Sequence, residues 1–253
     1  MSNSALIKSS LAKKYYMAAT GLFLCLFLVG HLLGNLQLLM PFDAEAKDGG
    51  AMFVFDQYAK FMTTNPLIKV MSYLTYFSIL FHAIDGILLT IQNKKARPVQ
   101  YAYNKPNENS KPQSRYMAIL GSAILIFIII HMANFWGVMH FGELKTYKVN
   151  GEEYKPLYAV VVLFFKSKTL GAIAALLYAL AMVVLGFHLS HGFKAAFQSL
   201  GLNHPKYNSI IQKTGLAFSV LVPLAFAIIP LYLAFVADFS AETLEMFEKG
   251  ITK

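Results

Sequence analysis

Five stretches of this chain are long and apolar enough to cross a membrane, and no other feature limits its fold as strongly. A helix needs about 20 apolar residues to span the hydrocarbon core of a bilayer. The chain of 253 residues is 57% hydrophobic, whereas soluble domains are about 45–50% apolar. The five stretches cover residues 16–40, 67–92, 116–140, 169–193 and 214–236. The sequence therefore predicts an all-α membrane protein, a single domain over residues 1–253, with five transmembrane helices in one bundle.

The first stretch is interpreted as a retained helix, although it follows three lysines as the core of a signal peptide would. A signal-peptide core runs for about 7–15 apolar residues. Residues 16–40 are longer than that and contain His31. Cys25, the only cysteine of the chain, also lies here, so no intrachain disulfide can form.

Charge is distributed unevenly between the two sides that five spans create. The side of the N-terminus also holds residues 93–115 and 194–213, and it carries twelve Lys and Arg residues against one acid, Glu108. The opposite side carries ten lysines against eleven acids. The positive-inside rule therefore predicts a cytoplasmic N-terminus. This pattern explains the net charge of +9 by orientation and anionic lipid rather than by nucleic acid, and a docked cytoplasmic partner is compatible with it.

Four histidines lie deep inside separate spans: His31, His82, His131 and His188. An ionisable ring in hydrocarbon is costly, so such residues mark a candidate functional site. At about 1.5 Å per residue from the flanking cytoplasmic charges, His31 and His131 lie about 25 Å deep, while His82 and His188 lie roughly 18 and 9 Å deep. The sequence therefore predicts a deep pair and a shallow pair. A histidine hydrogen-bonded within the core is the alternative for any one of them alone.

Two facing imidazoles can hold one haem iron through its axial positions. The two pairs therefore predict two haem b groups stacked across the membrane as a path for electrons. Several glycines lie near these histidines, namely Gly30, Gly34, Gly86, Gly186 and Gly192. They would leave room for a macrocycle or, equally, allow close packing of helices. The fifth span has no histidine but has Pro223 and Pro230, which predicts a kinked peripheral helix.

The residues around the histidines resemble those of a known family. They are Ala19-Thr20-Gly21-Leu22-Phe23-Leu24 before Val29-Gly30-His31, then Phe81-His82-Ala83, and Gly186-Phe187-His188-Leu189-Ser190-His191-Gly192. This pattern resembles the cytochrome b membrane-anchor subunit of bacterial succinate dehydrogenases and fumarate reductases, in its single-subunit form with five helices and two b haems. The resemblance runs through all five spans, and the four histidines fall where the ligands of the family fall.

The resemblance implies a quinone-reactive anchor in the bacterial cytoplasmic (inner) membrane. An iron–sulfur subunit and a flavoprotein subunit with the succinate or fumarate site would lie on the cytoplasmic face. His82 and His188 would hold the proximal haem iron, and His31 and His131 the distal one. Electrons would pass to or from a membrane quinone, usually menaquinone, in the tricarboxylic acid cycle or in anaerobic respiration. The direction, the quinone, the haem potentials and a dimer of heterotrimers stay open.

Acids near the quinone are expected because quinone chemistry moves protons. The connection after the first span offers Asp43, Glu45, Asp48 and Asp56. Asp56 is the preferred catalytic acid or base, because the apolar, aromatic run 53–58 would raise its pKa. A solvated loop charge is the alternative. Some family members carry a glutamate two residues before the fourth ligand; this chain has Gly186 there, so a proton route through that acid is predicted to be absent.

Two further polar residues lie close to the shallow pair. Asp85, one turn beyond His82, is a candidate to steer that ring, to approach a haem propionate, to relay protons, or to face a wet crevice. His191, three residues after His188, is a candidate propionate contact or an ordinary interfacial residue. His140 and His204 are interpreted as surface residues.

Two other classes of protein remain as alternatives. A b-type haem subunit of the hydrogenase, formate dehydrogenase or nitrate reductase type takes several ligands from fewer helices, so one histidine from each of four spans disfavours it. A histidine-lined metal or proton transporter should show interrupted half-helices or repeats and more acids within the membrane. Asp85 is the one acid within the five spans.

Overall fold

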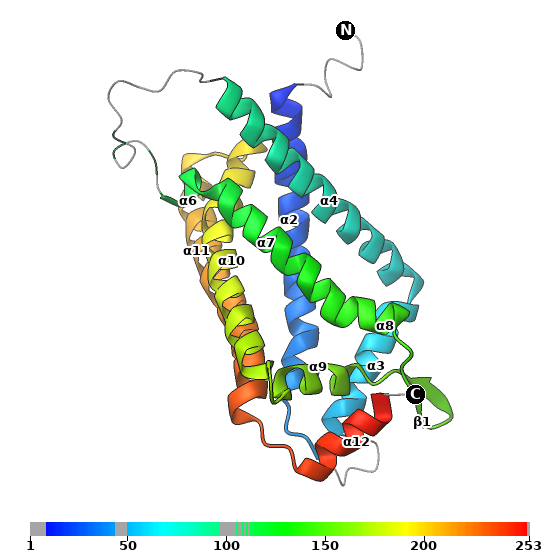
Figure 1. Cartoon of the computed structure of the whole chain (residues 1–253). Coiled ribbons are helices and arrows are strands. Elements are labelled where there is room, and N and C mark those ends of the chain that lie inside the picture. Colours follow the sequence, from blue (N-terminus) through cyan, green and yellow to red (C-terminus); the bar gives the residue numbers. More distant parts are fainter. Residues whose placement is uncertain are drawn as a thin grey trace. The chain divides into compact units, whose positions relative to one another are not determined.

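The protein is mostly helical, with five helices long and apolar enough to cross a membrane (Figure 1). The computed structural model describes residues 9–43, 50–96, 105, 108, 110 and 112–251. Four of them include α2 (Ser10–Asn35), α4 (Pro66–Lys95), α10 (Gly171–Ser199) and α11 (Pro205–Leu231), and the fifth is α7 (Met117–His131) with its continuation to Phe141. The predicted five apolar helices are thus confirmed, and they indicate a multi-pass membrane protein.

Polar residues set where the long helices begin. α4 starts at Pro66, and the side-chain oxygen of Asn65 accepts hydrogen bonds from the backbone N–H groups of Leu67 and Ile68 at 3.0 and 3.3 Å. An Asn cap followed by Pro at the first helical position is a favoured helix start. α11 begins in the same way at a proline, Pro205, nine residues before the predicted span. Hydropathy marks only the apolar part of a helix, which is why α4, α10 and α11 extend beyond the predicted spans at one end or both.

Two of the long helices continue into π-helical turns. One turn, Met132–Gly137, joins α7 to the short α8 (Val138–Phe141), and the other, Tyr232–Val236, follows α11. α11 continues as a helix through Pro223 and Pro230 before that turn. The prediction of a peripheral fifth helix is wrong for its last part, because Leu233 is completely buried. The reason is a group of connecting segments that pack around this end.

Those connecting segments form structure that hydropathy alone did not predict. They comprise α3 (Gly50–Thr64), the strands β1 (Tyr147–Val149) and β2 (Glu152–Tyr154), α9 (Leu157–Lys166) and α12 (Ala241–Ile251), besides the short α6 (Pro112–Arg115). The two strands pair antiparallel, with Tyr147 opposite Tyr154. Asn150 and Gly151 connect them with φ values of 51° and 83°. Positive φ at both central residues is the geometry that a tight hairpin requires.

The chain divides into two compact units, and the division falls within the five long helices. Unit 1 comprises Met1–Leu28, Tyr73–Leu125 and Val183–Pro223, and unit 2 comprises Val29–Ser72, Ile126–Met182 and Leu224–Lys253. In unit 1, α10 and α11 pack through the rings of Phe193 and Phe218, 5.8 Å apart. In unit 2, the helices α3, α9 and α12 and the hairpin lie together with parts of the long helices.

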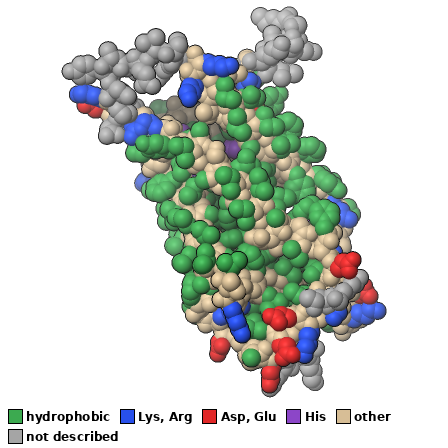
Figure 2. Space-filling view, viewed as in Figure 1, with side chains coloured by type: hydrophobic (Ala, Val, Ile, Leu, Met, Phe, Trp, Pro, Cys, Tyr) green, Lys and Arg blue, Asp and Glu red, His purple; other side chains and the backbone are tan. Residues whose placement is uncertain are grey.

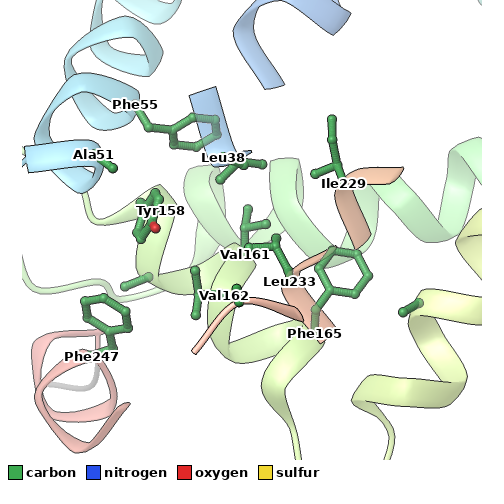
Figure 3. Packing of buried hydrophobic residues seen from close by; sticks show 13 residues of the cluster. Leu38, Ala51, Phe55, Tyr158, Val161, Val162, Phe165, Ile229, Leu233 and Phe247 are labelled. Atoms are coloured by element: carbon green, nitrogen blue, oxygen red, sulfur yellow. The ribbon is translucent and has the colours of Figure 1, made fainter. Parts of the chain in front are cut away.

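α9 lies at the centre of the hydrophobic core of unit 2 (Figure 3). Tyr158, Val162 and Phe165 of α9 have exposed fractions of 4% or less. Phe55 of α3 and Phe247 of α12 belong to the same cluster. The segments that follow the first, third and fifth long helices therefore pack together. A chain that crosses a membrane five times places these three segments on the same side.

Large apolar side chains cover the outside of the long helices (Figure 2). Leu67, Ile119 and Leu216, for example, are each more than 60% exposed. An apolar surface of this extent is unfavourable in water and favourable in lipid. Acidic side chains, shown in red in Figure 2, gather over the region of α12 and the hairpin.

Candidate functional site

The deep pair of histidines lies within unit 2. His31 is on α2, and His131 is the last residue of α7. Their ring centroids are 5.8 Å apart, and the ring planes make an angle of 84°. Both residues come from apolar spans, so two imidazoles from different helices meet edge to face in an apolar setting.

Aromatic rings surround the deep pair. Phe226 lies 5.6 Å from His31, and Phe127, Phe135 and Tyr178 lie 5.7, 5.3 and 5.9 Å from His131, between ring centroids. Next to this group the amide of Asn134 donates a hydrogen bond of 3.0 Å to the Tyr178 hydroxyl. Asn134 belongs to the π-helical turn that starts directly after His131. Such turns occur frequently at functional sites.

The shallow pair lies within unit 1. The rings of His82 on α4 and His188 on α10 have centroids 6.2 Å apart and planes at 70°. Each ring lies against a glycine of a neighbouring helix: a Cβ on Gly21 would lie 3.1 Å from Cε1 of His82, and one on Gly121 would lie 3.6 Å from Cε1 of His188. The predicted partners are therefore the histidines whose rings meet, and glycine allows the neighbouring backbone to approach the rings.

The Nδ1 atoms of the four histidines have different surroundings. Nδ1 of His82 lies 3.2 Å from the Thr20 hydroxyl, and Nδ1 of His31 lies 3.4 Å from the Asn35 amide nitrogen. Nδ1 of His131 and Nδ1 of His188 are buried without a hydrogen-bond partner. In each pair, therefore, one ring has a polar side chain at Nδ1 and the other ring does not.

The spacing of the rings fits a shared haem iron. Metal–imidazole bonds are about 2 Å long, which together with about 1 Å from each ring nitrogen to its ring centre separates two axial centroids by about 6 Å. The observed separations are 5.8 and 6.2 Å. In the described part of the chain, no group of three or more His, Cys, Asp or Glu side chains is placed to hold a metal ion. Haem iron needs only two protein ligands, so each pair by itself suffices.

Asp56 lies on α3 and is almost completely buried, with 1% of its surface exposed. Its Oδ1 accepts a hydrogen bond of 2.8 Å from the backbone N–H of Tyr158, and its Oδ2 accepts one of 2.9 Å from the Tyr147 hydroxyl. Burial raises the pKa of Asp56 to about 7, although hydrogen bonds from Tyr147 and from the backbone of Leu157 and Tyr158 act in the opposite direction. The alternative of a solvated loop charge is therefore wrong. The carboxylate caps the first turn of α9, which no side chain of its own caps.

The remaining candidate residues lie nearer to solvent or outside the described part. Asp85 on α4 and His191 on α10 are half-buried, one turn from His82 and His188 respectively. Asp43 is described at the end of the connection after α2, whereas Glu45 and Asp48 lie outside the described residues. His140 is exposed and its Nδ1 lies 2.8 Å from the Trp136 carbonyl oxygen.

Several residues near the histidines were missed from sequence. Thr20 and Asn35 are polar residues within an apolar helix. Asn35 follows His31 by four residues, one helical turn, so its contact could have been predicted from spacing. Thr20 lies 62 residues from His82, so its contact could not. The apolar run of α9 is ten residues long, which is too short to span a bilayer and suits a buried helix. The short length of this apolar run was thus the sequence signal that α9 is a buried helix in the core of unit 2.

No protein-family model, no curated protein and no solved structure matches this chain.

Proposed function

We propose that this chain is the di-haem cytochrome b membrane subunit of a succinate:quinone oxidoreductase, a succinate dehydrogenase or fumarate reductase. The observation that carries the proposal is the meeting of His31 with His131 and of His82 with His188, at ring separations of 5.8 and 6.2 Å, each pair bridging two apolar helices. An ionisable ring in hydrocarbon marks a candidate functional site, and here four such rings from four spans meet in two pairs at a spacing that suits two imidazoles on one iron.

In this proposal the two histidines of each pair would ligate the iron of one haem b. Bound haem supplies one-electron transfer. The chain's own residues hold the rings at fixed separation and exclude water: the phenyl groups of Phe127, Phe135 and Phe226 pack against the deep pair. An apolar shell of this kind controls solvent access and therefore the potential of a metal site.

The proposed partners follow from charge and from the sequence resemblance. The basic side of the chain, with Lys13, Lys14, Lys94, Lys95 and Lys194 among its residues, faces the cytoplasm of a bacterium and docks the iron–sulfur subunit, which in turn carries the flavoprotein. This chain is then the membrane subunit of the enzyme and does not itself bind the dicarboxylate. A membrane quinone, menaquinone in the form of the family that the sequence resembles, exchanges electrons with it.

Asp56 is the proposed acid or base at the quinone. A pKa of about 7 lets one carboxyl both take up and release a proton near neutral pH. The Tyr147 hydroxyl donates a hydrogen bond to Oδ2 of Asp56, so the proposed site contains two adjacent polar side chains. The same carboxyl caps α9, so its proton chemistry and the packing of unit 2 are linked.

The haem content of the purified chain tests the proposal. We expect two protohaems per chain, a low-spin bis-histidine visible spectrum, and two midpoint potentials in a redox titration. A folded preparation without haem would overturn the electron-transfer function and favour a histidine-lined metal or proton transporter.

The pairing is tested by replacing one ligand at a time. His131→Leu should remove one haem and leave the other, and His31→Leu should remove the same one, because two ligands are needed for a low-spin site. His140→Leu is the control, since this histidine is exposed and belongs to neither pair. Loss of different haems in the His31 and His131 variants would contradict the pairing. The spectra and potentials of the remaining haem identify which one is lost.

The role of Asp56 is tested by Asp56→Asn, which keeps the size of the side chain and removes the titrating proton. Quinone-dependent turnover of the assembled enzyme should fall at least tenfold, while the haem spectrum persists. Glu143→Gln, at an exposed position of a neighbouring connection, is the control. Normal quinone turnover in Asp56→Asn would remove Asp56 from the site and leave only its role as a cap.

A further inference from the structure

One side chain lies at hydrogen-bonding distance from a ring of the shallow pair. Oγ1 of Thr20 on α2 is 3.2 Å from Nδ1 of His82 on α4. The same hydroxyl donates a hydrogen bond of 2.7 Å to the carbonyl oxygen of Tyr16. Thr20 is thus the side chain through which α2 contacts the His82 ring by a polar group.

The backbone contacts of the Thr20 hydroxyl fix the direction of its hydrogen bond with His82. A hydroxyl has one proton, and the carbonyl oxygens of Tyr16 and Met17, at 2.7 and 3.2 Å from Oγ1, can only accept it. The oxygen of Thr20 is then the acceptor, so the proton between Thr20 and His82 belongs to Nδ1 of the imidazole. A neutral imidazole protonated at Nδ1 keeps its lone pair on Nε2. Nε2 is therefore the nitrogen of His82 that can bind a metal.

The residue after Thr20 limits where the ring can lie. A Cβ on Gly21 would be 3.1 Å from Cε1 of His82, which is closer than most Cβ contacts. Glycine lets the backbone of α2 approach the edge of the ring, and the adjacent hydroxyl reaches Nδ1. Thr20 and Gly21 together hold one edge of the imidazole.

The partner histidine has no such support. Nδ1 of His188 is buried and has no hydrogen-bond partner. A Cβ on Gly121 would lie 3.6 Å from Cε1 of His188, so α7 also approaches this ring through a glycine. No hydroxyl of that helix lies at Nδ1 of His188. The two ligands of the shallow pair therefore differ: the His82 ring has the Thr20 hydroxyl at Nδ1 and a backbone hydrogen bond with Met17, whereas Nδ1 of His188 has no partner.

We propose that Thr20 is a positioning residue for His82, which holds the ring in the Nδ1–H form and makes Nε2 a stronger electron donor to a bound metal. The inference rests on the proposed function, because it assigns a role toward the haem of the shallow pair. Hydrogen bonds from the outer nitrogen of a ligating histidine fix its orientation and raise its basicity. A more basic ligand stabilises the ferric state, and this lowers the midpoint potential of that haem.

Removing the hydroxyl reverses that effect at one haem. Thr20→Val keeps the shape of the side chain and removes the acceptor, so the midpoint potential of the haem held by His82 should rise and its ferric electron paramagnetic resonance (EPR) g-values should change. Thr20→Ser keeps the hydroxyl and should restore both. The second haem, held by His31 and His131, should keep its potential in all variants.

Thr90→Val is the matched control. Thr90 lies on α4, as His82 does, and its hydroxyl donates a hydrogen bond of 2.7 Å to the Gly86 carbonyl. Thr90 therefore shares the hydroxyl-to-backbone contact of Thr20 but has no histidine contact. A change in Thr20→Val that also occurs in Thr90→Val would show a general effect of losing a threonine hydroxyl and would overturn the inference.

The experiment is a redox titration with EPR spectra on the purified full chain. The inference is supported if wild-type protein has two haems, the midpoint potential of one haem rises in Thr20→Val, and that potential recovers in Thr20→Ser. Two haems with unchanged potentials and g-values in Thr20→Val overturns it and leaves the proposed function intact. Wild-type protein without haem overturns both. Thr20→Ala, which also lacks the hydroxyl, serves if Thr20→Val does not fold.

Discussion

At the scale of single residues, Asp56 combines features that oppose each other. Its carboxyl accepts hydrogen bonds, which favour the charged form, but it is removed from water, which disfavours that form more strongly. Glu152, by contrast, is exposed and hydrogen-bonded to Lys60 and Tyr154, and its pKa lies below the usual value. Burial is therefore what distinguishes the carboxyl of Asp56.

The raised pKa predicts how stability depends on pH. The pKa of Asp56 is about 7 in the folded protein and 3.8 in a model compound. Between these values the unfolded chain releases the proton and the folded one keeps it, so stability falls as pH rises, by about 1.4 kcal/mol per pH unit for one group. We therefore expect the difference in Tm between wild type and Asp56→Asn to decrease from about pH 4 to about pH 7.

Thermal melts of both proteins in one detergent across this range check the prediction. Other titrating groups are common to the two proteins, so their contributions largely cancel in the difference. A difference that increases with pH would mean that the folded protein holds Asp56 as a carboxylate, with its pKa lowered by Tyr147 and the Tyr158 N–H.

At the scale of elements, α9 connects the core of unit 2 with the surroundings of His131. Phe165 is 4% exposed, and its ring lies 5.3 Å from Tyr178 and 6.2 Å from Phe135, between centroids. Both of these residues also contact the His131 ring. α9, which is too short to span a membrane, is therefore part of the aromatic shell around the deep pair.

Phe165→Ala should destabilise unit 2 and weaken one haem site. Truncating a buried phenylalanine costs about 3–5 kcal/mol. We expect a lower Tm and, if the proposed haem is bound, faster loss of the haem assigned to His131 under mild denaturant, measured by absorbance. Phe77→Ala removes the same side chain from a position that is 56% exposed and should have little effect. Equal loss of both haems in Phe165→Ala would argue against a specific link between α9 and the deep pair.

At the scale of the whole molecule, membrane orientation is a prediction from charge. Unit 2 holds the connections after the first, third and fifth spans, and their packing into one core requires them to share a side. The excess of basic over acidic residues lies in the other connections and at the N-terminus, with twelve Lys and Arg residues against one acid. The positive-inside rule then assigns the core of α3, α9 and α12 to the outer side of the membrane.

Cysteine labelling tests this orientation. The one native cysteine, Cys25, is buried, so it gives a low background. In intact cells, Glu153→Cys should react with a membrane-impermeant maleimide, whereas Asn203→Cys should react only after the cells are permeabilised. Both positions are exposed. The opposite result would invert the orientation and place the proposed iron–sulfur partner on the wrong side.

The five spans and the candidate pairs could be predicted from sequence because both depend on position along a helix. Apolar length decides whether a helix can span a bilayer, and residue count from a charged end gives the depth of each histidine. Asp56 was identified from its apolar, aromatic neighbours in the sequence. These properties are local, so no knowledge of packing was needed.

The contacts that give these residues their properties were decided by the tertiary structure. Asp56 is buried because α9 and the hairpin, about a hundred residues further along the chain, pack against it. Thr20 reaches His82 only through the relative rotation of α2 and α4, and neither hydropathy nor spacing records rotation. The sequence by itself determined which segments are long and apolar enough to cross a membrane and where each histidine lies along its segment, because these follow from hydropathy and residue position. Which side chains meet depends on how helices far apart in the sequence pack, and only the folded chain decides that.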